Sequence, residues 1–286
     1  MGAAMQITEP LAFHGEGPIW FDGRQELRWV DMLQGDVLIF GSGGAVSRQQ
    51  FDTPVVAALR PRRRGGSIIA TERGFAIQLN LDSVELKPLA ATISKPTERM
   101  NEGGCDPDGR FYCGSMRYDT RPRAGTLYRL NLDRTVDVVL RDLTISNGLD
   151  WSPDGALAYF VDTPTNQIDV FDYDTDRGLT GRRRFAMIPP DSGQPDGLTV
   201  DADGGVWVAL WQGSAVHRYG SNGELDEIVE VPATNVTACT FGGRHRDELF
   251  ITTSQQGVAP GTDPLAGALF HTSPGVTGQA VRDYWG

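Results

Sequence analysis

The chain is poor in cysteine and has no long apolar segment, and each shortage removes a class of protein. Its three cysteines, Cys105, Cys113 and Cys239, have no zinc-type spacing. An odd count makes a poor disulfide framework, so we expect small buried thiols. The N-terminus lacks the basic and apolar regions of a signal peptide, and no apolar run reaches the length of a membrane span. We therefore expect a cytoplasmic protein.

Positive charge is also scarce. The 26 Lys and Arg residues are outnumbered by 37 Asp and Glu residues, which gives a net charge of −11 and a pI near 4.8. This balance argues against nucleic acid and anionic membranes as partners. The arginine runs at 62–64 and 182–184 lie between expected strands without interleaved aromatics, so we expect them on the solvated surface. The sequence carries no feature that sets an oligomeric state.

Helical periodicity is missing, and a repeat of turns takes its place. No stretch of ten or more residues has the 3.6-residue spacing of an amphipathic helix, which indicates an all-β protein. Turn motifs such as Ser152-Pro153-Asp154-Gly155 recur between β-rich runs and are typical of hairpins. The six turn glycines stand 43, 43, 46, 49 and 39 residues apart, at Gly23, Gly66, Gly109, Gly155, Gly204 and Gly243. This period predicts a six-bladed β-propeller with four antiparallel strands per blade.

Two strands of each repeat can be placed after its turn. The first set is expected at 27–31, 67–71, 110–114, 157–162, 206–210 and 248–252, and the second at 36–40, 74–79, 125–131, 167–173, 215–219 and 268–271. The repeats follow one another without a linker, so we expect a single domain over residues 1–286. Because a propeller must hide its edges, we predict that residues 6–13 form the outermost strand of the last blade.

An oxygen donor stands at the same position in four of the six repeats, seven or eight residues before the turn glycine. These donors are Glu16, Asn101, Asn147 and Asp196. Each alone reads equally well as a turn former or a solvated residue. The shared register favours a common site, because equivalent positions of repeats around an axis meet at that axis. The other two repeats carry Ala57, Ala58 and Thr237 near this position.

Four such donors suit a metal ion. Carboxylate and amide oxygens, with no thiolate and no required imidazole, favour a hard divalent cation such as Ca²⁺, Mg²⁺ or Mn²⁺. Zn²⁺ is a further candidate. Two carboxylates against one dication leave the site near neutral, with room for water or a substrate oxygen.

Several segments resemble the SMP-30/gluconolactonase/regucalcin family, in order and over nearly the full length. They are His-Gly-Glu-Gly-Pro-Ile-Trp at 14–20, Arg-Met-Asn-Glu-Gly at 99–103, Ser-Asn-Gly-Leu-Asp-Trp-Ser at 146–152, Pro-Asp-Gly at 195–197 and Phe-Gly-Gly at 241–243. The resemblance implies a six-bladed propeller with a divalent metal, Ca²⁺ first, in its channel. It assigns Glu16, Asn147 and Asp196 as the metal ligands and places Asn101 on a water or the substrate.

The resemblance also implies an activity and two substrate contacts. Members of this family hydrolyse sugar lactones. Arg99 matches an arginine that hydrogen-bonds sugar hydroxyls, and Asp119 lies where some members have an acidic substrate contact, although Glu is the residue found there. Glu102 and Cys105 depart from the family pattern without touching the metal set.

Lactone hydrolysis follows readily from such a site. A cation on the lactone carbonyl oxygen polarises it and stabilises the oxyanion. Asp196 is then the candidate general base toward water. No Gly-x-Ser-x-Gly elbow supports a Ser-His-Asp mechanism. His14 and Trp211 are candidates for the pocket wall, with core or surface packing as the alternative for each.

Three functions of different classes remain open. The first is a metal-dependent lactonase that makes aldonic acids. The second is an organophosphorus hydrolase of the diisopropylfluorophosphatase type, which uses a similar cluster of Glu, Asn and Asp. The third is a calcium-binding propeller in which the metal only braces the channel. Arg99 and Asp119 suit a polyhydroxylated substrate better than a phosphotriester.

Overall fold

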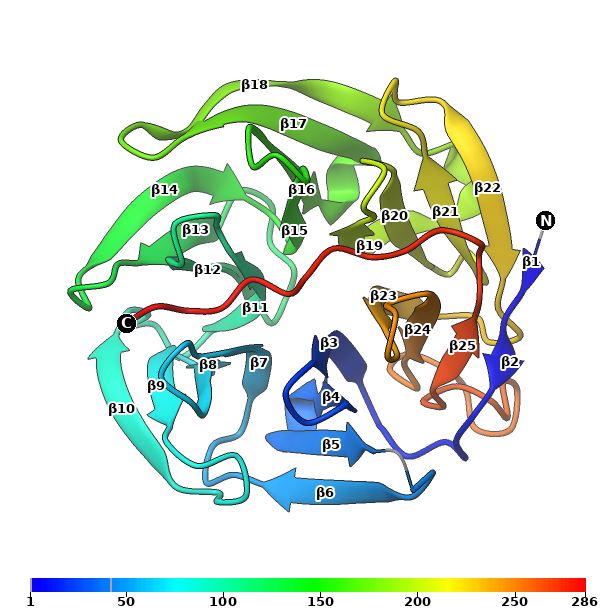
Figure 1. Cartoon of the computed structure of the whole chain (residues 1–286), viewed down its shortest axis with the longest axis horizontal. Helices are drawn as coiled ribbons and strands as arrows, with labels where there is room; N and C mark the ends of the chain where they lie inside the picture. Colours follow the sequence, from blue (N-terminus) through cyan, green and yellow to red (C-terminus); the bar gives the residue numbers. More distant parts are fainter. Residues whose placement is uncertain (1, 42) are drawn as a thin grey trace.

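The computed structural model describes residues 2–41 and 43–286, and its strands form six small sheets arranged in a ring (Figure 1). Blade 1 contains β3 (Gly15–Phe21), β4 (Glu26–Asp31), β5 (Asp36–Phe40) and β6 (Val46–Gln50). Blade 2 contains β7 (Val56–Pro61), β8 (Ser67–Thr71), β9 (Gly74–Gln78) and β10 (Leu86–Ala91). Blade 3 contains β11 (Glu98–Cys105), β12 (Phe111–Arg117), β13 (Gly125–Leu130) and β14 (Val136–Leu143). Blade 4 contains β15 (Ser146–Trp151), β16 (Leu157–Asp162), β17 (Gln167–Asp174) and β18 (Gly178–Met187). Blade 5 contains β19 (Gln194–Val200), β20 (Val206–Trp211), β21 (Ala215–Tyr219) and β22 (Leu225–Glu230). Blade 6 contains β23 (Val236–Gly242), β24 (Glu248–Thr253) and β25 (Phe270–Thr272). The predicted six-bladed, all-β propeller is confirmed.

Helix is confined to three single turns among the described residues. They are the 3₁₀ helices η1 (Met32–Gln34), η2 (Thr163–Thr165) and η3 (Pro190–Ser192). In the part of the chain that the structure covers, no helix has the length and apolar character needed to cross a bilayer.

The first strand of each blade lies innermost and contacts the first strands of the blades beside it. The ring of contacts runs through β3, β7, β11, β15, β19 and β23 and back to β3. The turn that follows the inner strand needs a left-handed residue, and Gly109, Gly155 and Gly204 supply it with φ of +74°, +73° and +83°. Glycine therefore recurs at these turns because the hairpin needs a residue that adopts positive φ.

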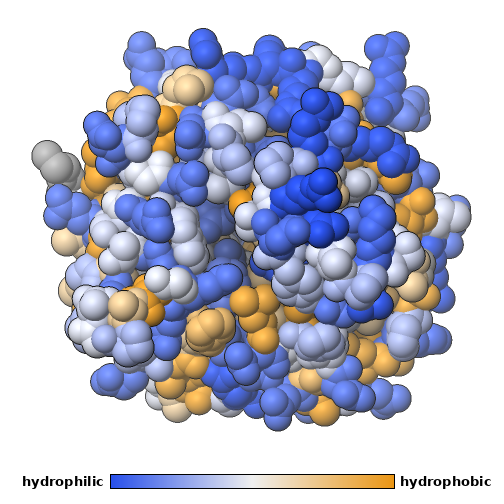
Figure 2. Space-filling view, turned by 180° about the vertical axis from the view of Figure 1, so that it is seen from behind, coloured by the Kyte–Doolittle hydropathy of each residue, from blue (hydrophilic) through white to orange (hydrophobic). Residues whose placement is uncertain are grey.

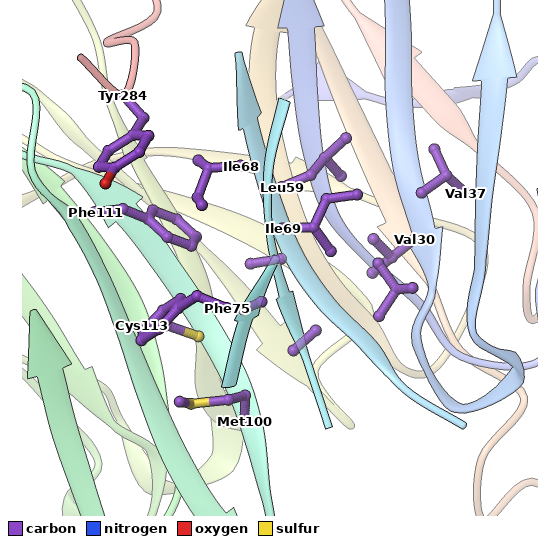
Figure 3. Packing of buried hydrophobic residues seen from close by; sticks show 14 of the residues in the cluster. Val30, Val37, Leu59, Ile68, Ile69, Phe75, Met100, Phe111, Cys113 and Tyr284 are labelled. Carbon is purple, nitrogen blue, oxygen red and sulfur yellow. The ribbon is translucent and has the colours of Figure 1, made fainter. Parts of the chain in front are cut away.

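The core lies between neighbouring blades rather than within one sheet. Each blade packs against a neighbouring blade on both of its faces. Strands such as β8 and β9 are therefore apolar and buried along most of their length. Figure 3 shows one such cluster, formed by blades 1 to 3 and the C-terminal segment: Val30, Val37, Leu59, Ile68, Ile69, Phe75, Met100, Phe111, Cys113 and Tyr284. All three cysteines are buried and free, as expected.

The N-terminal segment closes blade 6, as predicted, but through a shorter strand that begins earlier. Strand β2 (Met5–Gln6) pairs antiparallel with β25 as the fourth strand. Beyond Ile7 the ladder is replaced by single bonds to the loop before β25, because Pro10 has no N–H to donate. Strand β1 (Gly2–Ala3) adds a feature that the sequence did not indicate, since it joins blade 5 as a parallel fifth strand beside β22.

The C-terminal tail, residues 273–286, crosses one face of the ring from blade 6 to blade 2 (Figure 1). It bonds to Arg246 in blade 6 and Ala202 in blade 5, and Gln279 reaches the carbonyl of Trp151 in blade 4. Near its end Tyr284 donates its N–H to Pro61 in blade 2 and is fully buried. The tail therefore covers one end of the central channel.

Candidate functional site

The four predicted oxygen donors meet in a pocket of about 390 Å³ at the other end of the channel. Glu16 comes from β3, Asn101 from β11, Asn147 from β15 and Asp196 from β19. Each is at most 5 % exposed. Figure 2 views the molecule from this side, opposite to the tail, and its middle is hollowed. The shared register of the four repeats thus places four side chains around one void.

A β-bulge at each donor explains how an inner strand aims its side chain into the channel. The pairing between first and second strands slips from Glu16 to Ile19 in blade 1 and from Ser146 to Leu149 in blade 4. Blades 3 and 5 slip at the equivalent places. An extra residue bends the strand and re-aims its neighbours. The donors therefore occupy bulges, which the repeat carries in every blade.

Two further carboxylates hold the inner strands of blades 1 and 4 in place. Asp31, at the end of β4, accepts the backbone N–H groups of Phe13 and His14 at 3.1 and 2.9 Å. Asp162, at the end of β16, does the same for residues 144 and 145 at 2.9 to 3.1 Å. The residue two positions further along each strand is a predicted metal ligand. These buried aspartates therefore anchor the backbone from which Glu16 and Asn147 project.

A chain of hydrogen bonds fixes the amide side chains in the pocket. Arg99 donates from Nη1 to Asn101 Oδ1 at 2.5 Å, and Asn101 donates from Nδ2 to Asn147 Oδ1 at 2.7 Å. Asn147 in turn donates from Nδ2 to Thr163 Oγ1 at 2.7 Å. Both amides therefore have a defined orientation, with the oxygen of Asn147 on the side of Asn101.

Two buried carboxylates, Glu16 and Asp196, share this pocket with one guanidinium, and a third, Glu102, lies further along the channel at the tail end. Burial raises the pKa of Glu16 to about 7, against the opposing effects of the Gly17 N–H and the charge of Arg99. Burial, followed by repulsion from Glu16 and Glu102, raises the pKa of Asp196 well above its usual value. Burial and the charge of Glu16 do the same to the pKa of Glu102. The region carries more buried negative charge than Arg99 balances, and a bound cation would relieve it.

A divalent cation fits the residues that are present. Asp196 Oδ1 is buried without a hydrogen-bond partner, and Asn147 Oδ1 accepts one bond and keeps a second lone pair. Over residues 2–41 and 43–286, no three His, Cys, Asp or Glu side chains are grouped as a metal centre. A cation here therefore needs the amide oxygen of Asn147 beside the carboxylates of Glu16 and Asp196. Such a mixed oxygen set suits hard cations.

His14 and Trp211 both line the pocket. Their ring centroids lie 6.1 Å apart with an interplanar angle of 78°. His14 Nδ1 is 2.8 Å from Ser254 Oγ, and the imidazole is buried. Burial and the nearby charge of Arg99 lower the pKa of His14 to about 3. The ring is therefore neutral at physiological pH.

Asp119 lies apart from the other predicted site residues. It follows β12, and its carboxylate accepts bonds from Arg117 Nε and Nη2 at 2.7 and 2.8 Å. These bonds lower the pKa of Asp119 to about 2. The next residue, Thr120, does line the pocket, and Asp119 does not. Its role as a substrate contact stays a prediction.

Sequence reasoning missed several pocket residues. Thr163 on η2 orients Asn147, and Gln194 and Gln256 line the wall. Gln194 lies two residues before Asp196 on β19, so strand alternation could have identified it. Gln256 lies in the connection after β24, where no periodic pattern indicates which residues face the pocket.

Comparison with known proteins identifies the family of the chain. A family model described as the SMP-30/gluconolactonase/LRE-like region matches residues 14–255. Regucalcin from Danio rerio is 34% identical over 282 residues, 95% of each chain. The putative sugar lactone lactonase YvrE from Bacillus subtilis is 34% identical over 278 residues, 93% of each chain.

A solved structure gives the same result for the fold. It is that of a calcium-binding protein, regucalcin, from Agrobacterium tumefaciens, and it superposes with a TM-score of 0.93 at 26% identity, covering 99% of this chain and 97% of that one. The chain therefore belongs to the SMP-30/gluconolactonase/LRE-like family, as its motifs predict.

Proposed function

We propose that this protein is a divalent-metal-dependent lactonase that opens sugar lactones to aldonic acids. The observation that carries the proposal is the unpartnered, buried Oδ1 of Asp196 in the wall of a pocket shared with Glu16, Asn147 and Arg99. The name of the Bacillus subtilis relative supports the class of reaction. The description of the Agrobacterium tumefaciens structure as calcium-binding supports a divalent metal.

Glu16, Asn147 and Asp196 would hold the cation, with Ca²⁺ as the first candidate and Zn²⁺, Mn²⁺ or Mg²⁺ as others. When bound, the cation supplies Lewis-acid polarisation of the ester carbonyl and compensates the negative charge that develops on its oxygen. The protein's own contribution is to fix these three ligands on three separate blades before the substrate arrives.

Asp196 carries the proton in this mechanism. Its carboxylate accepts a proton from the attacking water and then returns it to the ring oxygen as the ester bond breaks. Arg99 uses Nη1 for its bonds to Met100 and Asn101, which leaves other guanidinium N–H groups for a substrate hydroxyl. Asn101 keeps the amide of Asn147 in a single orientation.

The pocket wall favours a sugar lactone over the other two functions. Arg99, Gln194 and Gln256 give it hydrogen-bonding groups that a phosphotriester would leave unpaired. A metal that only braces the channel requires no adjoining void, whereas this site opens into about 390 Å³.

A substrate panel tests the proposal. Purified protein is stripped with chelator, reloaded with Ca²⁺, Mn²⁺ or Zn²⁺, and assayed by proton release on γ- and δ-sugar lactones and on a phosphotriester. We expect lactone hydrolysis that disappears with chelator and returns with metal. Hydrolysis of every lactone at only the background rate would reject the proposal. Activity on the phosphotriester alone would indicate an organophosphorus hydrolase instead.

A further inference from the structure

His14 occupies a fixed position at the mouth side of the donor cluster. The inner strands run from the pocket end toward the tail end, so His14, which precedes Glu16 and β3, lies nearer the opening. Its backbone N–H is held by Asp31, its carbonyl accepts the N–H of Met32, and a β-bridge joins it to Ser254. These contacts come from blades 1 and 6, so His14 is held in place by both blades between which it lies.

The Ser254 hydroxyl determines which imidazole nitrogen is left for a ligand. Ser254 Oγ accepts the N–H of Gln256 at 3.0 Å and lies 2.8 Å from His14 Nδ1. It also lies 3.4 Å from the carbonyl of Phe13, so Ser254 can bond to Nδ1 either as the donor or as the acceptor. In both arrangements Nδ1 is occupied by Ser254. Nε2 is therefore the imidazole nitrogen that can bond to a ligand.

Trp211 limits where Nε2 can point. Its indole stands nearly perpendicular to the imidazole, and both rings line the same void. Nε2 has no hydrogen-bond partner among the described residues, so a bound molecule is its available partner. The carbonyl of a bound lactone belongs deeper, among Glu16, Asn147 and Asp196. The group within reach of His14 is thus a substituent on the ring.

We infer that His14 is a substrate-binding residue that forms a hydrogen bond through Nε2 with a hydroxyl of the lactone, with Ser254 as the residue that positions it. This inference rests on the proposed lactonase function and specifies how the pocket selects hydroxylated lactones. It gives the protein a means of discrimination that is separate from the metal and from Asp196.

Two substrates and three variants test the inference. D-glucono-δ-lactone carries ring hydroxyls, and δ-valerolactone has the same ring without them. In His14→Phe, which keeps an aromatic ring beside Trp211, we expect KM for gluconolactone to rise roughly ten-fold with kcat within about three-fold. The KM for δ-valerolactone should not change. His14→Gln, whose amide can donate or accept from a similar place, should restore KM to within about three-fold of the native value.

Ser254→Ala provides a second approach if His14→Phe does not fold, because it leaves the imidazole in place. It should raise KM for gluconolactone by a smaller factor and leave δ-valerolactone unaffected. An unchanged KM for gluconolactone in both variants would overturn the inference, and so would an equal rise for both lactones, which indicates a structural role. If native protein hydrolyses neither lactone, the proposed function fails and the inference with it, an outcome visible without any variant.

Discussion

Carboxylates line both ends of the central channel, but the two ends differ in the groups beside these carboxylates and in the volume of the adjoining cavity. At the pocket end Glu16 and Asp196 stand beside amide oxygens, next to about 390 Å³ of space. At the tail end Glu102 and Asp150 line a cavity of about 60 Å³, together with two arginines, beneath the crossing C-terminal tail. Asp196 Oδ1 and Glu102 Oε2 are equally buried and unpartnered.

This comparison shows that a buried carboxylate with a free oxygen is not sufficient for a binding site. The tail-end cavity of about 60 Å³ has room for a few water molecules, whereas the pocket at the other end is several times larger. Arg60 and Arg282 also give its carboxylates partners of opposite charge nearby. The pocket end has amide oxygens, an opening and, among its described lining residues, only Arg99 as a cation. The following predictions test whether this division between the ends holds.

The largest effect is expected from the two matched carboxylates. Asp196→Ala should lower kcat/KM for a sugar lactone about 10³- to 10⁴-fold, because it removes both a metal ligand and the proton acceptor. Glu102→Gln keeps the shape of the tail-end residue and should leave kcat/KM within about three-fold. Initial rates of proton release measure both. Comparable losses in the two variants would show that the ends act as one site.

The tail is expected to matter for stability and not for chemistry. Tyr284 is fully buried in the cluster between blades 1 and 3, and its hydroxyl bonds to the carbonyl of Asn131 at 3.0 Å. Tyr284→Ala should lower the free energy of unfolding by about 3–5 kcal/mol. The neighbouring Trp285 is 39% exposed, so Trp285→Ala should cost less. Urea unfolding measures both, and a selective loss of kcat in Tyr284→Ala would contradict the separation of the two ends.

Metal affinity provides a third comparison. Glu16→Gln removes one charged ligand and should weaken Ca²⁺ binding at least ten-fold, as measured by calorimetry. Asp119→Asn is the control, because Asp119 is exposed and bonded to Arg117. Its Ca²⁺ affinity should be unchanged. A rise of KM in this control without loss of metal affinity would confirm the predicted substrate contact of Asp119.

The smallest expected effect is a change in the pH dependence of stability. In metal-free protein the pKa of Glu16 is about 7, against an ordinary value of 4.5. Between these pH values the folded state binds more protons than the unfolded state, so Glu16 stabilises the fold below pH 4.5 and this contribution is lost as pH rises through 7. Glu16→Gln should make the slope of unfolding free energy against pH more positive, by at most ~1.4 kcal/mol per pH unit. An unchanged slope in chelator would show that Glu16 titrates normally.

The sequence predicts the ring and the donor cluster because both depend on a local repeat. Five of the six turn glycines have positive φ, and the donors stand seven or eight residues before their turns, so Glu16, Asn101, Asn147 and Asp196 could be placed together without a tertiary model. The bulges that aim the donors leave no distinct pattern in the sequence, but they recur in every blade and therefore do not disturb the register.

Features that lie outside the repeat could not be predicted in this way. Asp119 lies on the connection after β12, where its bonds to Arg117 set its direction. The N-terminal strand begins at Met5 because β25 is only three residues long and offers few partners. The path of the tail depends on contacts with blades 2 to 6, so no periodicity within residues 273–286 indicates it.

The position of the last residues has a practical consequence. The carbonyl of Gly286 accepts hydrogen bonds from Arg62 in blade 2, on the face that the tail crosses. A linker attached at Gly286 therefore leaves the molecule on the side away from Glu16 and Asp196. Protein immobilised on a sensor or resin through a linker at Gly286 should present the opening of the pocket to the solution, unobstructed by the support.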